Sequence, residues 1–221
     1  MSVWTVVVAA GRAERFGGDK QMADLGGRPV VAHSVSAAAK ASDGVVVVVA
    51  ADKRAEALIL LDGLDCVAVV VDGGATRSAS VRSGLAAVPD DVEIVMVHDG
   101  ARPLASTALF ARVVAAVRAG ADAVVPGVPV ADSLRAVDGS VVDRVGLIAV
   151  QTPQGFPADW LRSAHVGCDN ASDDATLVEA AGGTVVVVEG EAANLKITRP
   201  TDLVLAARVL GVANGGGVEH G

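Results

Sequence analysis

The chain has 221 residues, of which 52% are hydrophobic and 2% aromatic, and its formal net charge is −8. This length suits one α/β domain, whose core must be built from Val, Ala and Leu because aromatic residues are scarce. The acidic balance argues against a nucleic-acid-binding surface, and the longest apolar run, residues 45–51, is too short to cross a bilayer.

Predicted strands and helices alternate along the first 125 residues. The strands are apolar on both faces, which is typical of buried parallel strands. They are expected at residues 5–9, 45–49, 67–71, 94–97 and 123–125. Helices are expected at about residues 29–39, 51–61, 78–87 and 106–119. Ser78 and either Ser106 or Thr107 are candidate N-caps. The alternation predicts an α/β fold, with a Rossmann-like, mostly parallel central sheet covered by helices on both faces.

The alternation breaks at Pro126. Beyond it, Asp138-Gly139 is a strong hairpin signal between two short segments that can pair. We call residues 129–148 the arm. A two-stranded arm is marginally stable alone, so we expect it to lie against something, such as a second subunit.

The alternation then resumes towards the C-terminus. A strand is expected at residues 149–151, followed by helices near Asp159 and Asp173. A further strand is expected at residues 184–188 and a last helix at residues 201–210. We expect one domain over residues 1–212 and a disordered tail over residues 213–221.

The cysteine content and the N-terminal sequence indicate a cytoplasmic setting. Cys66 and Cys168 have no metal-binding or redox spacing, and two thiols do not make a disulfide framework. The first residues lack the basic region and apolar stretch of a signal peptide. Both cysteines are interpreted as packing residues.

A loop of small residues and cations follows the first predicted strand. Ala9, Ala10 and Gly11 leave room for another molecule to approach the backbone, and Arg15 and Lys20 follow them. Clustered cations after the first strand of an α/β domain are typical of a phosphate site. The alternative is a strand-to-helix turn with solvated charges. Neither a P-loop nor a G-x-G-x-x-G pattern is present, which disfavours an NAD(P)-dependent oxidoreductase.

Polar residues also follow the later strands, and the carboxyl ends of parallel strands meet at one edge of a sheet. Gly74 and Ser80 follow the third strand, where they either approach a ligand or form a capped turn. Asp99 and Arg102 follow the fourth predicted strand. They either place substrates or pair with each other to fix the loop, and the two roles can coexist. His98 is interpreted as a hydrogen-bonded structural residue rather than a general base.

Six motifs occur in order between Val6 and about Leu205. They are AAG at 9–11 with Arg15 and Lys20-Gln21, HDGARP at 98–103, PVADSLR at 129–135, QTPQGF at 151–156, SDDA at 172–175 and NLKIT at 194–198. Together they resemble the motifs of the 2-C-methyl-D-erythritol 4-phosphate cytidylyltransferases, nucleotidyltransferases of the non-mevalonate isoprenoid pathway.

The resemblance implies a reaction. CMP passes from CTP to 2-C-methyl-D-erythritol 4-phosphate, with Mg²⁺, giving 4-diphosphocytidyl-2-C-methyl-D-erythritol and pyrophosphate. It implies that Arg15 and Lys20 hold the CTP phosphates, and that Arg144 and Lys196 hold the acceptor. It assigns no protein ligand to the metal. The acceptor phosphate is largely dianionic at pH 7, so its attack needs no general base.

The resemblance also implies which residues place the substrates. It implies in addition that a partner subunit takes part in the site. The residues implied in substrate placement are Ala9, Ala10, Gly11, Gly74, Ser80, Asp99, Arg102 and Ser133. In the family, the arm crosses to the partner of a homodimer and carries the positions of Ser133 and Arg144 into the partner's site.

The sequence departs from the family pattern at several positions, three of which lie at or near implied site residues. Asp19 stands in place of the usual Pro and adds an anion beside the phosphate loop. Gly100 replaces an Ala, which is expected to loosen that loop slightly, and Ser133 replaces a Thr but keeps the hydroxyl. Two alternatives stay open, a ribitol-5-phosphate cytidylyltransferase on the same scaffold and a catalytically silent nucleotide-binding protein.

Overall fold

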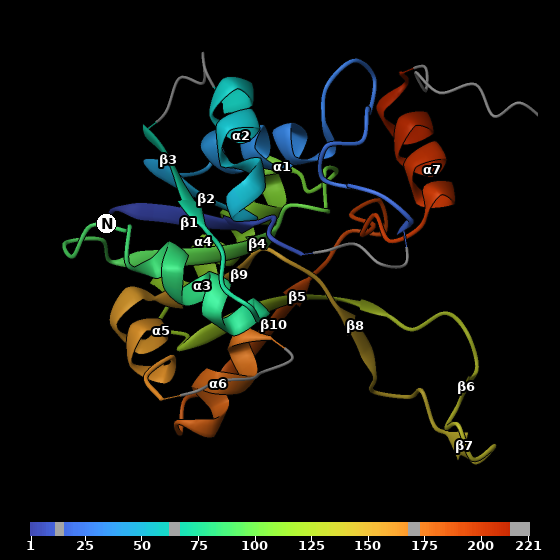
Figure 1. The fold of residues 1–221 in the computed structure, drawn as a ribbon. Helices are drawn as coiled ribbons and strands as arrows, with labels where there is room; N and C mark the ends of the chain where they lie inside the picture. The colour runs from blue at the N-terminus through green and yellow to red at the C-terminus, as the bar shows by residue number, and fades with distance from the viewer. Residues whose placement is uncertain (12–15, 62–66, 168–172, 213–221) are drawn as a thin grey trace, which may run out of the picture.

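The computed structural model describes residues 1–11, 16–61, 67–167 and 173–212. The two cysteines and the expected tail at residues 213–221 therefore lie outside the described residues. Within the described part, the centre is a sheet of eight strands in the order β10-β5-β9-β4-β1-β2-β3, with β8 paired to β5 (Figure 1). The strands are β1 (Val3–Val8), β2 (Gly44–Val49), β3 (Val67–Asp72), β4 (Ile94–Asp99), β5 (Ala123–Pro129), β8 (Ile148–Val150), β9 (Gln154–Pro157) and β10 (Val185–Glu189).

The expected mostly parallel sheet is confirmed. Four neighbouring pairs are parallel, namely β1–β2, β1–β4, β2–β3 and β5–β10. Strand β9 was not predicted, and it runs antiparallel between β4 and β5. Its four residues include Gly155 and Pro157, which usually indicate turns. Gly155 is needed there because an added Cβ would lie 2.4 Å from Val113 Cγ1.

Strand β5 is longer than expected and continues through Pro126 to Pro129. Proline lacks a backbone N–H, which made Pro126 look like a strand end. Its carbonyl nevertheless accepts a hydrogen bond from the backbone N–H of Gln151 at 2.8 Å. The strand therefore passes through a proline and carries the chain out to the arm.

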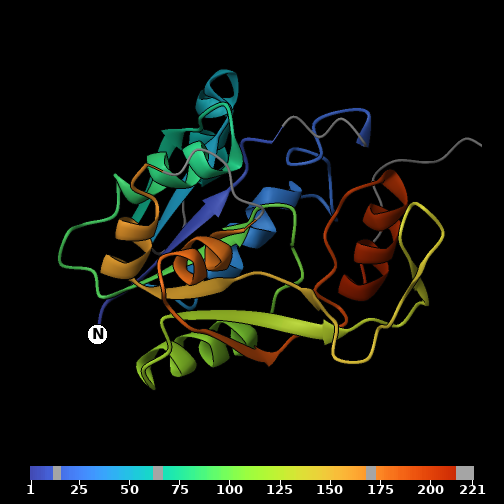
Figure 2. The ribbon, with the colours of Figure 1, turned by 90° about the horizontal axis from the view of Figure 1, so that it is seen from below.

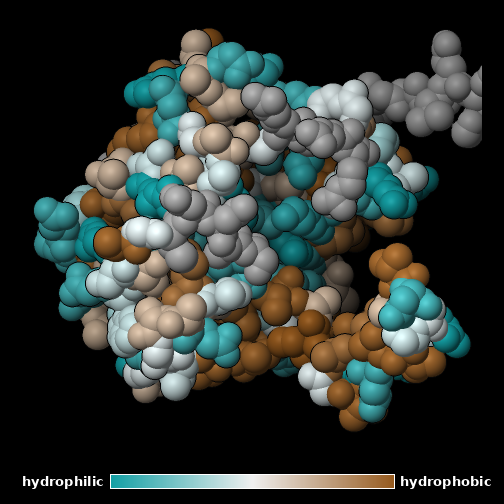
Figure 3. All heavy atoms as spheres, turned by 60° about the horizontal axis from the view of Figure 1, so that its bottom comes forward, coloured by the Kyte–Doolittle hydropathy of each residue, from teal (hydrophilic) through white to brown (hydrophobic). Residues whose placement is uncertain are grey.

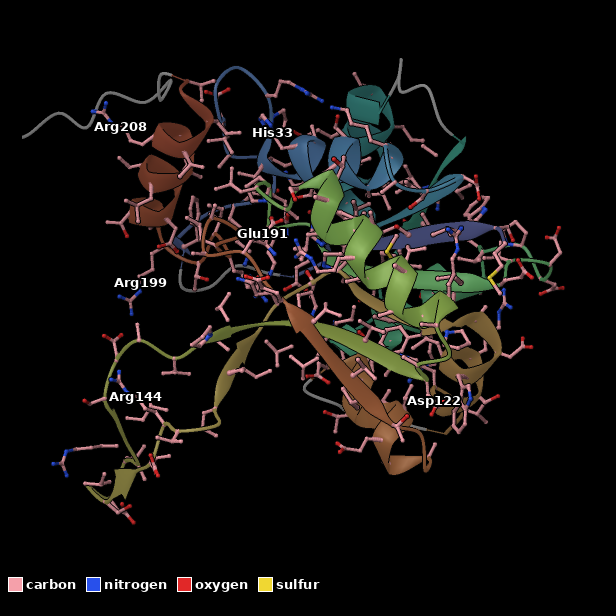
Figure 4. All side chains as sticks on the ribbon, turned by 180° about the vertical axis from the view of Figure 1, so that it is seen from behind. His33, Asp122, Arg144, Glu191, Arg199 and Arg208 are labelled. Carbon is pink, nitrogen blue, oxygen red and sulfur yellow. The ribbon has the colours of Figure 1, made fainter. Side chains whose placement is uncertain are left out.

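Helices cover both faces of the sheet, as expected, with α1 and α4 on one face and α3, α5 and α6 on the other (Figures 2 and 4). The helices are α1 (Val30–Ala39), α2 (Arg54–Leu61), α3 (Arg77–Leu85), α4 (Thr107–Arg118), α5 (Ala158–Ala164), α6 (Asp174–Ala180) and α7 (Pro200–Leu210), with a 3₁₀ turn at Ala51–Lys53. No helix in the described residues is long and apolar enough to span a membrane.

The helix caps correct one expectation. Ser106 caps α4, because its Oγ accepts from the backbone N–H of Leu109 at 3.1 Å. Ser78 does not cap α3. The cap is Thr76, whose Oγ1 accepts from the backbone N–H of Ala79 at 3.1 Å. Helix α3 therefore begins at Arg77, shortly after the Gly73-Gly74 turn, which brings its first residues to the carboxyl end of the sheet.

Valines build the core on both faces of the sheet. In β2, Val45, Val47 and Val49 pack in the cluster that contains α1 and α4. Val46 and Val48 pack in the opposite cluster with α3, α5 and α6. Successive side chains of a strand point to opposite faces, so a continuous valine run fills both layers.

The arm projects from the body of the molecule (Figure 1). Within it, β6 (Leu134–Arg135) and β7 (Val141–Val142) form an antiparallel pair, which confirms the hairpin predicted at Asp138-Gly139. Gly139 has a φ of 88°, a value that glycine adopts readily. All residues from 135 through 150 are exposed.

Candidate active site

A cleft of about 1210 Å³ lies at the carboxyl ends of β1, β2, β3 and β4. Its walls include residues at or just beyond the end of each of these strands, and Lys196 from the segment before α7. This confirms that the polar segments converge at one edge of the sheet. Pockets for single small ligands usually measure about 300–1,000 Å³, so the cleft has room for a nucleotide and a second substrate.

The loop after β1 forms one wall of the cleft. Ala9, Ala10, Gly11 and Lys20 all line it. An added Cβ at Gly11 would meet nothing within 4 Å, so the backbone there faces open space. Arg15 lies outside the described residues.

The turn between β3 and α3 forms a second wall. The backbone N–H of Gly74 donates to Ser80 Oγ at 3.1 Å, and Ser80 Oγ donates to the carbonyl of Thr76 at 2.9 Å. An added Cβ at Gly73 would lie 2.4 Å from the Cβ of Ala10. Gly73 therefore lets this turn pack closely against the β1 loop, and the Ser80 hydroxyl bridges groups within the turn. Both Gly74 and Ser80 line the cleft.

Asp99, at the end of β4, is the anionic centre of the cleft. Lys196 Nζ lies 2.7 Å from Asp99 Oδ2, and Arg102 Nε lies 3.7 Å from the same oxygen. Burial, which leaves the side chain 14% exposed, by itself raises the pKa of this carboxyl. The charges of Lys196, Arg77 and Arg102 outweigh burial and lower the pKa to about 2. Asp99 is thus fully ionised at neutral pH.

His98 lies behind Asp99 in a chain of hydrogen bonds. The backbone N–H of Asp99 donates to Thr152 Oγ1 at 3.0 Å, and that hydroxyl lies 3.1 Å from His98 Nδ1. His98 Nε2 lies 3.2 Å from the carbonyl of Arg102. Burial lowers the pKa of His98 to about 4, so the ring is neutral and its Nε2–H donates to that carbonyl. This geometry favours the structural interpretation of His98.

The two departures near the cleft have local explanations. Asp19 Oδ1 accepts from the backbone N–H groups of Gln21 and Met22, and Asp19 Oδ2 lies 3.3 Å from Lys53 Nζ. The added anion is therefore paired. Gly100 is buried, and an added Cβ would lie 3.0 Å from the Cβ of Ala9, so a glycine fits closely at this position.

The arm residues lie apart from the cleft. Ser133 and Arg144 are exposed, and neither is among the described residues that line it. Figure 4 shows Arg144 on the arm, away from the sheet. Two further cations, Lys53 and Arg77, line the cleft and were not predicted as site residues from the sequence. Arg77 lies in the polar segment after β3, but nothing in its immediate sequence separates it from an ordinary helix-surface arginine.

An open α/β sheet with a cation-lined cleft at its strand ends defines a protein that binds anionic ligands. The family described as 2-C-methyl-D-erythritol 4-phosphate cytidylyltransferase matches residues 3–212. Two proteins of that name, from Streptomyces avermitilis and Nocardia farcinica, are 44% and 46% identical over 225 and 218 residues. The first alignment covers 93% of this chain and 90% of the relative, and the second covers 95% and 94%.

A solved structure supports the same assignment. The crystal structure of 2-C-methyl-D-erythritol 4-phosphate cytidylyltransferase from Thermus thermophilus matches with a TM-score of 0.82 and 40% identity. The match covers 96% of this chain and all (100%) of that one. The fold and the cleft are thus those of a nucleotidyltransferase. The chain belongs to the 2-C-methyl-D-erythritol 4-phosphate cytidylyltransferase family, and the ribitol-phosphate alternative is not favoured.

Proposed function

We propose that this enzyme transfers CMP from CTP to 2-C-methyl-D-erythritol 4-phosphate, a step in making isoprenoid precursors. An oxygen of the acceptor phosphate attacks the α-phosphorus of CTP. The bond from that phosphorus to the oxygen that bridges to the β-phosphate breaks, and pyrophosphate leaves with the electron pair. The observation that carries the proposal is the pairing of Asp99 with Lys196 inside a cleft that Lys20 also lines.

Fixed cations suit this reaction because anions must be brought together. Arg15 and Lys20 are proposed to hold the CTP phosphates and to stabilise the charge that develops on them in the transition state. The small residues after β1, with Gly74 and Ser80, are proposed to hold the nucleoside. Lys196 is proposed to hold the acceptor phosphate, at a position set by Asp99 and by the Arg102 bond to the carbonyl of Asn194 at 2.8 Å.

Magnesium is part of the proposal. The carboxylates of Asp19, Asp52 and Asp99 line the cleft, and no group of three or more His, Cys, Asp or Glu side chains that could hold a metal occurs among the described residues. This donor set fits Mg²⁺, which is usually bound by one or two carboxylates together with substrate phosphates. The ionised Asp99 would be the protein ligand. When bound, the ion would neutralise charge on the phosphoryl groups.

A homodimer built through the arm is also proposed. The arm exposes Val137, Val141 and Val145, whose exposed fractions are 109%, 72% and 84%. Figure 3 shows apolar surface along the arm and the adjoining body. An exposed apolar hairpin of this kind suits burial against a second copy of the chain. The crossing would carry Ser133 and Arg144 into the partner's cleft. We further propose a cytoplasmic setting, supported by the low cysteine content.

Pyrophosphate release tests the reaction. CTP, UTP, ATP and GTP are each supplied with Mg²⁺ and either methylerythritol phosphate or ribitol 5-phosphate. Release with only CTP and methylerythritol phosphate, abolished by a chelator, is the expected result. Release with ribitol 5-phosphate instead would show that the acceptor is ribitol 5-phosphate rather than methylerythritol phosphate. A folded protein that binds CTP yet releases nothing would be the silent binder.

Mixed subunits test the arm. Lys20→Ala and Arg144→Ala subunits are co-expressed with different tags and the mixed dimer is isolated. If each arm completes the partner's site, one site of the mixed dimer carries both substitutions and the other carries neither, so about half of the wild-type activity per dimer returns. Activity no higher than that of the two parent variants would place Arg144 in its own subunit's site, and a monomeric wild type would exclude the dimer.

A further inference from the structure

An ion pair at the wall of the cleft, with a buried carboxylate, has no part in the reaction described above. Arg77 NH2 donates to Asp174 Oδ2 at 2.7 Å, and His165 Nε2 lies 3.0 Å from Asp174 Oδ1. The side chain of Asp174 is only 1% exposed, and that of His165 only 2%. Asp174 belongs to the SDDA motif at 172–175, to which no role has been assigned.

The cation of this pair faces the cleft. Arg77 lines the cleft, and its side chain is 27% exposed. One end of the Arg77 guanidinium is therefore fixed by a buried carboxylate, while the residue as a whole borders the substrate space.

This arrangement is poorly explained by stability alone. Burying a carboxylate and a guanidinium costs desolvation free energy, and a well-packed apolar pair is often as stable. A guanidinium that is already held on one side loses little freedom when it binds a phosphate with its remaining N–H groups. A fixed guanidinium at the edge of a phosphate-binding cleft is thus better suited to binding than to packing.

We propose that Arg77 binds a phosphate group of CTP, and that Asp174, held by His165, is a positioning residue that aims the Arg77 guanidinium. The inference rests on the proposed function. Arg77 begins α3, directly beside the turn where Gly74 and Ser80 are bonded to each other. The acceptor residues proposed above come instead from the arm and from the segment before α7. The nucleotide is therefore the substrate that Arg77 serves.

The test is CTP binding by titration calorimetry with Mg²⁺ and without acceptor, so that no turnover is needed. Four variants are compared, Arg77→Lys, Arg77→Gln, Asp174→Asn and the double variant Arg77→Gln/Asp174→Asn. The control is Arg162→Lys. Arg162 is 24% exposed and bonds to the carbonyls of Val88 and Pro89, outside the cleft.

We expect Arg77→Gln and Asp174→Asn each to raise the Kd of CTP about tenfold, with a smaller rise in Arg77→Lys and none in the control. The double variant should match Arg77→Gln within about twofold, because Asp174 acts through Arg77. In turnover, KM for CTP should rise more than KM for the acceptor.

Two results would overturn the inference. One is a folded double variant that binds CTP as the wild type does. Because this variant removes both charges, it stays informative if a single variant leaves an unpaired buried charge and does not fold. The other is additive effects of the two single changes, which would mean that Asp174 does not act through Arg77. A wild type that binds CTP but releases no pyrophosphate would instead count against the proposed function alone.

Discussion

Lys196 Nζ lies 2.7 Å from Asp99 Oδ2, which ties the segment before α7 to the carboxyl end of β4. Arg102 reinforces this tie, because it lies beside the same carboxylate and donates to the carbonyl of Asn194 at 2.8 Å. The cation proposed for the acceptor is therefore held by an anion on the sheet. Substitutions at Asp99 should act on both the acceptor site and the stability of the fold.

Asp99→Asn should change how stability depends on pH. The folded-state pKa of about 2 lies below the value of 3.8 of a free carboxyl, because Lys196, Arg77 and Arg102 outweigh burial. The ionised group therefore stabilises the fold above about pH 4, and this contribution is lost as the pH falls towards 2. The wild type should lose about 2 kcal/mol more than Asp99→Asn between about pH 5 and pH 2, measured by urea unfolding. Equal losses would contradict the assigned pairing.

His98→Gln should make the free energy of unfolding depend less on pH in a second, higher pH range. Burial lowers the pKa of His98 from 6.5 to about 4, so the unfolded chain takes up a proton that the folded chain does not. Stability should therefore fall as the pH drops from about 6.5 to 4, by an amount on the order of 2 kcal/mol. His98→Gln should lack this component in urea unfolding at about pH 7 and 4.5. A variant whose stability falls as steeply as that of the wild type would show that His98 is already protonated in the fold.

Lys20→Ala should lower kcat at least about 100-fold, because it removes a fixed charge at the transferring phosphates. The measurement is pyrophosphate release, with circular dichroism to confirm that the variant is folded. The matched control is Lys40→Ala, since Lys40 is an exposed lysine at the end of α1 that does not line the cleft. A near-normal kcat in folded Lys20→Ala would remove Lys20 from the mechanism.

Asp19→Asn should leave the Kd of CTP within about threefold of the wild-type value, because Lys53 already offsets the charge of Asp19. Calorimetric titration with CTP measures this directly. The amide oxygen of Asn can still accept from the backbone N–H groups of Gln21 and Met22, so the turn should be retained. CTP binding that tightens tenfold or more would show that the Asp19 charge repels the nucleotide despite its partner.

Local sequence patterns were sufficient to predict several strands, the loop after β1 and the hairpin of the arm. The valine runs predicted the buried strands β1 and β2, and the small residues at 9–11 predicted an open loop. Both predictions need only the residues that are adjacent in the chain. The Asp138-Gly139 pair predicted the hairpin for the same reason. Because parallel strands end at one edge of a sheet, the order of the elements was enough to predict where the cleft would lie.

Contacts between distant segments were decided only by the tertiary structure. Strand β9 forms because its residues pair with both β4 and β5, although their local sequence is typical of a turn. The pairing of Arg77 with Asp174 joins the starts of α3 and α6. Asp174 lies in the SDDA motif, but nothing in the sequence indicates that its partner is Arg77. Such ion pairs form when the packing of distant elements buries two opposite charges next to each other. That packing depends on the whole fold rather than on nearby residues.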